Sequence, residues 1–117
     1  MPELDENGLP TSDTIRALHN RVSVRKYTDE PVTDEQVEAI LRAAFRAPTS
    51  SNIQSYSVVV VRDKDTLAKL APVTGNQKHV AEAPVFLAFC ADMTRIEHAM
   101  ANSGESIDNN NFEMGLV

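Results

Sequence analysis

The spacing of apolar residues predicts an amphipathic helix in the first half of the chain. After residue 33 the apolar positions recur three or four residues apart, which places them on one face of a helix. These positions are Val37, Ile40, Leu41, Ala44 and Phe45. Thr33 followed by Gln36 has the pattern of a capping box, in which two side chains satisfy free N–H groups of the first turn. We therefore expect a helix that begins after Thr33 and ends near Pro48.

The residues before this helix are predicted to form an arm and a shorter helix. Residues 1–12 contain few apolar side chains together with a glycine and two prolines, as is typical of a loosely held terminal segment. Ser12 or Asp13 then caps a helix that runs to about Val22 and ends before the break at Pro31. Its inward-facing residues would be Ile15 and Leu18.

Two runs of apolar residues predict strands. Residues 56–61, "YSVVVV", are rich in β-branched side chains, and residues 85–91, "VFLAFCA", repeat this composition. Neither run alternates apolar and polar residues as a strand with one wet face would, so we expect both in the middle of a sheet covered on both sides. The single cysteine, Cys90, lies in the second run, where we expect a buried small hydrophobic residue and no nucleophile.

The remaining segments predict further helices, which makes the chain an α/β protein. A short helix is expected within residues 62–73, at most one turn before Pro84, and another helix after Asp92. "FEMGLV", residues 112–117, resembles the start of a helix whose first apolar turn is not completed. Two buried strands do not make a self-sufficient sheet. We therefore expect the neighbouring strands to come from a missing part of a longer chain or from another subunit of an oligomer.

Composition and charge disfavour several classes of protein. With 117 residues, 42% of them hydrophobic, the chain suits one globular domain. A net charge of −6 opposes binding to a nucleic acid, which is a polyanion. No apolar run approaches the ~20 residues of a membrane span. The start, "MPELDENGLPTSD", lacks the basic and apolar parts of a signal peptide, and we expect a cytoplasmic protein without membrane contact.

The common signatures of metal, nucleotide and hydrolase sites cannot be written from this sequence. The three histidines, His19, His79 and His98, lack a thiol or carboxylate at ligand spacing. The four glycines form neither a GxGxxG motif nor a Walker motif. "PTSSN" has no flanking glycines to make the tight turn of a serine nucleophile. Any chemistry must therefore come from other polar clusters.

Two polar clusters have the composition of a ligand site. In "RVSVRK" the side chains of Arg21, Ser23 and Arg25 alternate with valines, so an extended backbone points them to one side, as a clamp for a phosphate. "PTSSNIQ" adds the uncharged amides of Asn52 and Gln54, which can meet the edge of a polar heterocycle. Together they suggest a mononucleotide-like cofactor. A solvated helix end and ordinary helix termination are the alternative interpretations.

Three blocks of sequence resemble one known family. "RVSVRKYTDEPV", "APTSSNIQSYSVVVV" and "TGNQKHVAEAPVFLAFCAD", in this order and separation, resemble the N-terminal half of the FMN-dependent nitroreductases, particularly the NADPH-dependent flavin oxidoreductases. The likeness covers roughly residues 14–96, with a weaker trace at "MGLV". It implies a three-layer sandwich with a central mixed sheet between helices. Residues 13–117 would be the N-terminal part of its FMN-binding domain, apparently truncated because family members are considerably longer.

The resemblance also implies roles for individual residues. The FMN phosphate, ribityl chain and pyrimidine side would contact Arg21, Ser23 and Arg25. The residues placed against the flavin from the other subunit of a homodimer are Pro48, Thr49, Ser50 and Asn52. The residues expected near the ring edge are Gln77 and Lys78. Gln54 matches the motif too, either by touching the flavin or by supporting the loop.

The implied activity is that of an oxidoreductase in which FMN carries the redox chemistry and no side chain is a required acid or base. NADPH or NADH would donate electrons by a ping-pong mechanism to nitroaromatic, quinone or flavin acceptors, which are small and flat. Alternatives are a dehalogenase or flavin-consuming enzyme on the same scaffold, and an inactive chain that only binds flavin or pairs with a longer partner. Tyr56 and Ser57 stand where many relatives carry a proline and an aromatic residue, so the motif does not fix the substrate range.

Overall fold

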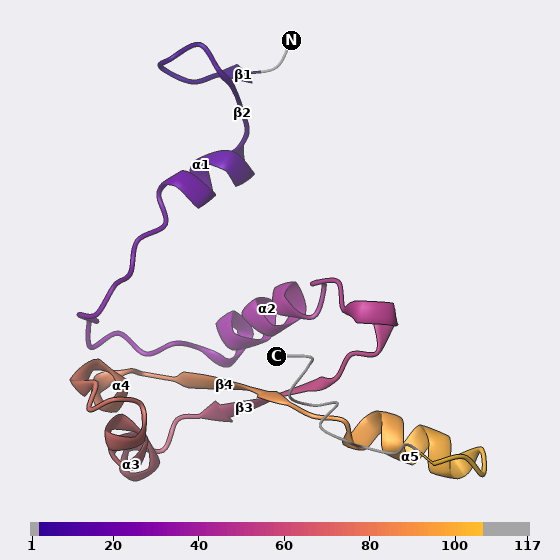
Figure 1. Ribbon diagram of the computed structural model, residues 1–117. Helices are drawn as coiled ribbons and strands as arrows, with labels where there is room; N and C mark the ends of the chain where they lie inside the picture. Colours follow the sequence, from indigo (N-terminus) through magenta and orange to yellow (C-terminus); the bar gives the residue numbers. More distant parts are fainter. Residues whose placement is uncertain (1–2, 107–117) are drawn as a thin grey trace.

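The computed structural model describes residues 3–106 (Figure 1). From residue 13 onward its elements follow the predicted order of helices and strands, whereas the predicted arm contains two short paired strands. They are β1 Glu3–Leu4, β2 Pro10–Thr11, α1 Asp13–His19, α2 Asp34–Ala44, a 3-10 turn Ser50–Asn52, β3 Tyr56–Val61, α3 Lys64–Val73, α4 Lys78–Glu82, β4 Phe86–Ala91 and α5 Thr94–Asn102. The segment "FEMGLV", for which the start of a helix was predicted, lies outside the described residues.

The predicted capping box at the start of α2 is confirmed. The Gln36 backbone N–H donates to Thr33 Oγ1 over 3.2 Å, and the Thr33 N–H donates to Gln36 Oε1 over 2.8 Å. Val37 is the buried residue of this helix. Arg62, which follows β3, donates to the Val32 carbonyl over 2.6 Å and to Asp34 Oδ1 over 2.9 Å. The start of α2 is thereby joined to one end of the sheet.

Both predicted strands are present, but their predicted burial is wrong for this chain on its own. β3 and β4 pair antiparallel, with Tyr56 opposite Ala91 and Val61 opposite Phe86. Phe89 is 59% exposed, and Cys90 is exposed where burial was predicted. The physical reason is that, within residues 3–106, each of these strands has a single hydrogen-bonded neighbour.

The first helix is shorter and less buried than the sequence predicts. α1 is capped by Ser12, as expected, but it ends at His19 and not near Val22. Its apolar residues do not face inward, since Ile15 is 39% exposed and Leu18 is 67% exposed. Figure 1 shows the reason: α1 and the β1–β2 hairpin stand away from the rest of the chain, beyond the irregular segment 21–33.

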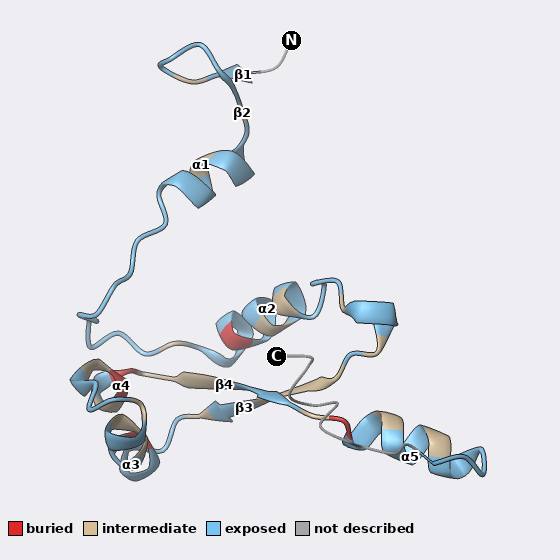
Figure 2. Cartoon of the chain, viewed as in Figure 1, coloured by how far each residue is buried: buried red, intermediate tan, exposed pale blue. Residues whose placement is uncertain are grey.

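The buried core among the described residues is small. Its members are Val37, Leu67, Val80, Ala83 and Met93. In Figure 2 buried positions appear as small patches, where α3 meets α4, on α2 and just before α5. The radius of gyration is 19.2 Å, whereas a compact domain of this length has about 13 Å. Many large apolar side chains among residues 3–106 are therefore exposed. No helix among residues 3–106 is long and apolar enough to cross a membrane.

Candidate functional site

The arginines predicted to bind a phosphate lie on the irregular segment between α1 and α2. Arg21, Ser23 and Arg25 are all exposed. The ion pairs formed within residues 3–106 involve other cations, so both guanidinium groups are available to an anion. Lys26 follows directly and adds a third positive charge. This segment therefore has the charge and the accessibility that a phosphate clamp needs.

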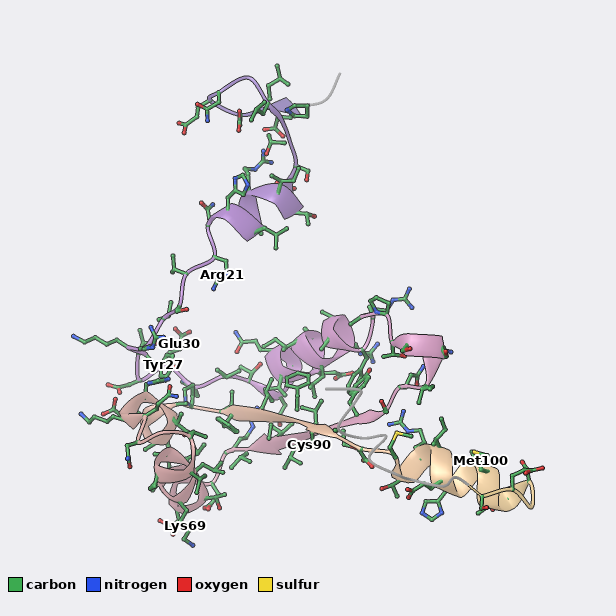
Figure 3. All side chains as sticks on the ribbon, viewed as in Figure 1. Arg21, Tyr27, Glu30, Lys69, Cys90 and Met100 are labelled. Carbon is green, nitrogen blue, oxygen red and sulfur yellow. The ribbon has the colours of Figure 1, made fainter. Side chains whose placement is uncertain are left out.

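One aromatic contact brings the end of this segment to α4. The rings of Tyr27 and His79 meet edge to face, with centroids 6.3 Å apart. Figure 3 shows Tyr27 above the end of the molecule where α4 lies. Gln77 and Lys78 precede His79 directly, so this contact brings the end of the segment that carries Arg25 toward α4, whereas Arg21 lies farther away (Figure 3).

The turn before α4 holds Gln77 in place. Gly75 and Asn76 both have positive φ angles, of 86° and 57°, a conformation that glycine and asparagine tolerate better than other residues. The Gln77 side chain donates from Nε2 to the Thr74 carbonyl over 2.8 Å, so its Oε1 remains available. Lys78 Nζ lies 2.9 Å from Glu82 Oε1, and this hydrogen bond raises the pKa of Lys78. The ammonium group stays protonated at neutral pH, with part of its charge offset by Glu82.

The "PTSSNIQ" loop lies between α2 and β3 and has an unusual backbone. Ser51, Asn52 and Gln54 have φ angles of 50°, 55° and 54°. A left-handed conformation costs about 1–2 kcal/mol for a residue with a side chain, and such strain gathers at functional sites. The Gln54 N–H donates to Thr49 Oγ1 over 3.1 Å, which closes the loop. Thr49 is half-buried, whereas Pro48, Ser50 and Asn52 are exposed.

An arginine that sequence reasoning missed reaches this loop. Arg95, in the first turn of α5, donates from Nη1 to Gln54 Oε1 over 3.4 Å, and Gln54 Nε2 donates to Asn52 Oδ1 over 3.1 Å. A pocket of about 210 Å³ is lined by Phe45, Gln54, Tyr56 and Arg95. In the sequence, Arg95 is distinguished only by being a positively charged residue shortly after the strand predicted at residues 85–91.

Asp92 attaches the start of α5 to the start of β3. Its backbone N–H donates to the Ser55 carbonyl over 3.0 Å, and its carboxylate accepts from the Ser57 hydroxyl and, over 2.9 Å, from the Thr94 N–H. The Ser57 hydroxyl, followed by Thr94, lowers the pKa of Asp92 from 3.8 to about 2. The carboxylate is therefore ionised at neutral pH, as its hydrogen bonds require.

The predicted clusters lie at opposite ends of the β3–β4 sheet. The "PTSSNIQ" loop leads into Tyr56, at the end where Tyr56 pairs with Ala91, and α4 leads into Phe86, at the end where Val61 pairs with Phe86. Five residue steps of about 3.4 Å separate these ends by roughly 17 Å. One chain therefore does not gather all the predicted residues. The site shared between two subunits stays a prediction. Residues 3–106 contain no group of three His, Cys, Asp or Glu residues able to hold a metal ion.

Sequence comparison finds relatives over most of the chain. The profile of the Nitroreductase family matches residues 18–112. An FMN reductase (NAD(P)H) of Bacillus subtilis is 42% identical over 89 residues, which are 76% of this chain and 36% of that protein. An oxygen-insensitive NADPH nitroreductase of Salmonella typhimurium is 48% identical over 84 residues, or 72% of this chain and 35% of that protein. The chain thus spans little more than a third of these relatives.

Solved structures share the arrangement of the described elements. B. megaterium NfrA2 superposes with a TM-score of 0.85 at 32% identity, over 91% of this chain and 44% of that one. The NADPH:FMN oxidoreductase from Vibrio harveyi complexed with NAD+ gives a TM-score of 0.76 at 36% identity, over 90% of this chain and 44% of that one. These likenesses confirm the predicted α/β fold class. Within residues 3–106, the pairs β1–β2 and β3–β4 are both antiparallel.

Proposed function

The chain belongs to the nitroreductase family, and we propose that residues 13–117 are the N-terminal part of an FMN-dependent oxidoreductase that uses NADPH or NADH. Its acceptors would be nitroaromatic compounds, quinones or flavins. The observation that carries this proposal is the family match over residues 18–112, which includes every residue assigned to the cofactor. The identity of 42% to an FMN reductase supports the cofactor. Residues 1–12 would be an arm outside the cofactor site.

The residues present fit an FMN molecule by their chemistry. Arg21 and Arg25 are exposed and outside the ion pairs of the described residues, as a clamp for a phosphate monoester requires. Asn52 and Gln54 supply neutral amides, which can match a ring edge that carries both donors and acceptors. When bound, FMN supplies the chemistry of accepting a hydride from NAD(P)H and passing electrons to a second substrate.

The charged residues near the ring would adjust the reduction potential of FMN and need not transfer protons. Arg25 and Lys78 would hold positive charge near the ring, which raises its reduction potential. Lys78 has the weaker effect because Glu82 lies 2.9 Å from its ammonium group. The protein would otherwise orient the ring and leave one face open to a flat acceptor.

We propose a homodimer with FMN at the interface. The support is the position of the "PTSSNIQ" loop and of α4, where Lys78 lies, at opposite ends of the β3–β4 sheet, so that one chain does not bring these residues together. A second copy could supply the missing half to each flavin. We also propose a cytoplasmic location, since a single cysteine gives no sign of the disulfides common in oxidising compartments.

Flavin binding by the purified chain tests the proposal. We expect an absorption spectrum of bound oxidised FMN, bleaching by NADPH, and recovery on addition of a quinone. Arg25→Ala should weaken FMN binding about tenfold or more, because a charge-assisted hydrogen bond to the phosphate is lost. Arg42→Ala is the matched control, because Arg42 pairs with Glu38 on the exposed face of α2. Full flavin content in Arg25→Ala would refute the phosphate assignment.

A second candidate is a chain that binds flavin without turning over. The observation that favours it is the open structure, with its radius of gyration of 19.2 Å. A flavin spectrum that NADPH does not bleach would support this candidate over the reductase. Bleaching without reoxidation by a quinone would instead favour another flavin enzyme on the same scaffold, such as a dehalogenase.

A further inference from the structure

The proposed function assigns no role to Arg95, although it contacts a loop in which three residues have positive φ angles. We propose that Arg95 is a positioning residue, which fixes the side-chain amides of Gln54 and Asn52 so that their N–H groups are offered to the ligand. The proposal rests on the proposed function for the identity of that ligand, an FMN ring. The orientation of the two amides does not depend on it.

The direction of both amides follows from the chemistry of a guanidinium group. Arginine has five N–H donors and no acceptor, so the atom of Gln54 that faces Arg95 must be the oxygen Oε1. The amide nitrogen Nε2 then points to the other side, where it donates to Asn52. Asn52 must in turn present its oxygen Oδ1 to Gln54. One cation thereby sets the orientation of two neutral side chains in series.

The contacts of α5 with β3 hold Arg95 in place. Asp92, three residues earlier, is joined to the start of β3 by its hydrogen bonds with Ser55 and Ser57. Between Asp92 and Arg95, Met93 is buried, with 3% of its surface exposed. The first turn of α5 is thus attached to the strand that the "PTSSNIQ" loop enters, and the Arg95 side chain extends from a fixed base.

The backbone of the loop needs such support. Asn52 and Gln54 have positive φ angles. Their side-chain amides are the two that Arg95 orients through hydrogen bonds. Residues with strained backbone conformations persist where several surrounding contacts hold them in place. The Thr49 hydroxyl holds the backbone of Gln54, and Arg95 holds its side chain.

This arrangement predicts what the loop can recognise. Among the described residues, one N–H of Gln54 Nε2 and both N–H groups of Asn52 Nδ2 have no acceptor. Three donors on one loop suit the carbonyl-rich edge of a polar ring and disfavour an edge rich in N–H groups. Without Arg95, either amide could rotate and present its oxygen instead.

The first test uses the full chain without added ligand. In a ¹⁵N–¹H spectrum, Arg95→Met should shift the side-chain amide signals of Gln54 and Asn52 and speed their exchange with water. Arg42→Met, an arginine replaced on the exposed face of α2, should leave these signals unchanged. Circular dichroism reports whether each variant is folded. If Arg95→Met is unfolded, Arg95→Ala, which likewise removes every side-chain donor, takes its place. Unchanged amide signals in a folded Arg95 variant would overturn the proposal.

The second test asks whether Arg95 acts through Gln54. We expect Arg95→Met to weaken FMN binding about fivefold, the effect of one ordinary hydrogen bond, and Arg95→Lys to recover part of the loss. In a Gln54→Ala background, Arg95→Met should have no further effect on affinity. Equal losses in both backgrounds would show that Arg95 acts independently of Gln54 and would overturn the proposal.

The reduction potential of the bound flavin gives a readout that a merely structural role would not move. Loss of donors at the ring carbonyls should lower this potential in Arg95→Met relative to the wild-type chain and the Arg42→Met control. An unchanged potential, with weakened binding, would count against the proposal. If the wild-type chain binds no FMN, the proposed function fails for these residues, while the amide spectra still decide the role of Arg95.

Discussion

Asp92 has the largest resolved change in pKa among the described residues, and its role can be tested by pH. Its pKa falls from 3.8 to about 2, mainly through the hydrogen bond from Ser57. Because the folded-state pKa is lowered, the carboxylate stabilises the fold above pH 3.8, and this contribution is lost as the pH falls toward about 2. We expect Asp92→Ala to lower the urea midpoint at neutral pH and to differ little from wild type at about pH 2.

The control for this experiment is Thr28→Ala, which removes an exposed hydroxyl before α2 and changes no charge. The difference in urea midpoint between this control and the wild-type chain should be the same at every pH. A difference between wild type and Asp92→Ala that persists unchanged to about pH 2 would contradict the assigned role of the ionised carboxylate.

Gly75 is the residue at which backbone conformation alone should decide the effect of a substitution. Its φ of 86° lies in the left-handed region, and an added Cβ would meet only Gln77 Nε2 at 3.9 Å. Gly75→Ala should therefore reduce the free energy of unfolding by about 1 kcal/mol from strain without a clash. Gly75→Asn should recover part of this loss, because asparagine tolerates the conformation better. Equal stability of Gly75→Ala and wild type in urea unfolding would refute the argument.

At the scale of single residues, local sequence pattern could nominate candidate site residues but could not predict which residues contact each other. Arg21, Ser23 and Arg25 could be selected because their alternation is local. The contact of Arg95 with Gln54 spans 41 residues, and nothing in either neighbourhood of sequence points to the other. The exposure of Cys90 was also missed, since burial depends on what covers a strand and not on the composition of the strand.

The capping box of α2 allows a prediction at the scale of one element. Thr33→Ala removes the hydroxyl that accepts from the Gln36 N–H, so we expect a loss of about 1 kcal/mol in the free energy of unfolding. Thr33→Ser keeps the hydroxyl and should retain most of the stability. Thr28→Ala, in the irregular segment before α2, is the matched control. A Thr33→Ala variant as stable as this control in urea unfolding would contradict the assigned cap.

Elements were predictable where local chemistry determines them. α2, β3, α3 and β4 have a cap, a period or a β-branched run that specifies them within a few residues. α1 was predicted too long, because Asn20 and Val22 are poor helix formers and no element packs against them to extend the helix. The pairing of β3 with β4 needed the structure, because a strand's own sequence does not specify its neighbour.

At the scale of the whole molecule, the apolar surface left open is the main physical fact. Leu18, Phe45, Val59 and Phe89 are each more than half exposed. Exposed apolar area of this kind is a driving force for association, because removing it from water is favourable. The sequence had already indicated this, since two strands without polar faces require neighbours. Both the separated site residues and the exposed apolar surface therefore require further protein surface, either from another part of a longer chain or from another subunit.

The exposed apolar surface predicts that the chain associates with further copies of itself. The chain of 12.9 kDa should sediment as a dimer or larger species, and Phe89→Asp should shift it toward the monomer, because a charge on the open sheet face opposes burial. Lys69→Asp, an exposed change on α3, should leave the mass unchanged. A change in the core acts on stability and not on association: Leu67 is fully buried, so Leu67→Ala should reduce the free energy of unfolding measured in urea by about 3 kcal/mol. A wild-type chain that stays monomeric at all concentrations would argue against a shared site, because the separated clusters would then have no second copy to complete them.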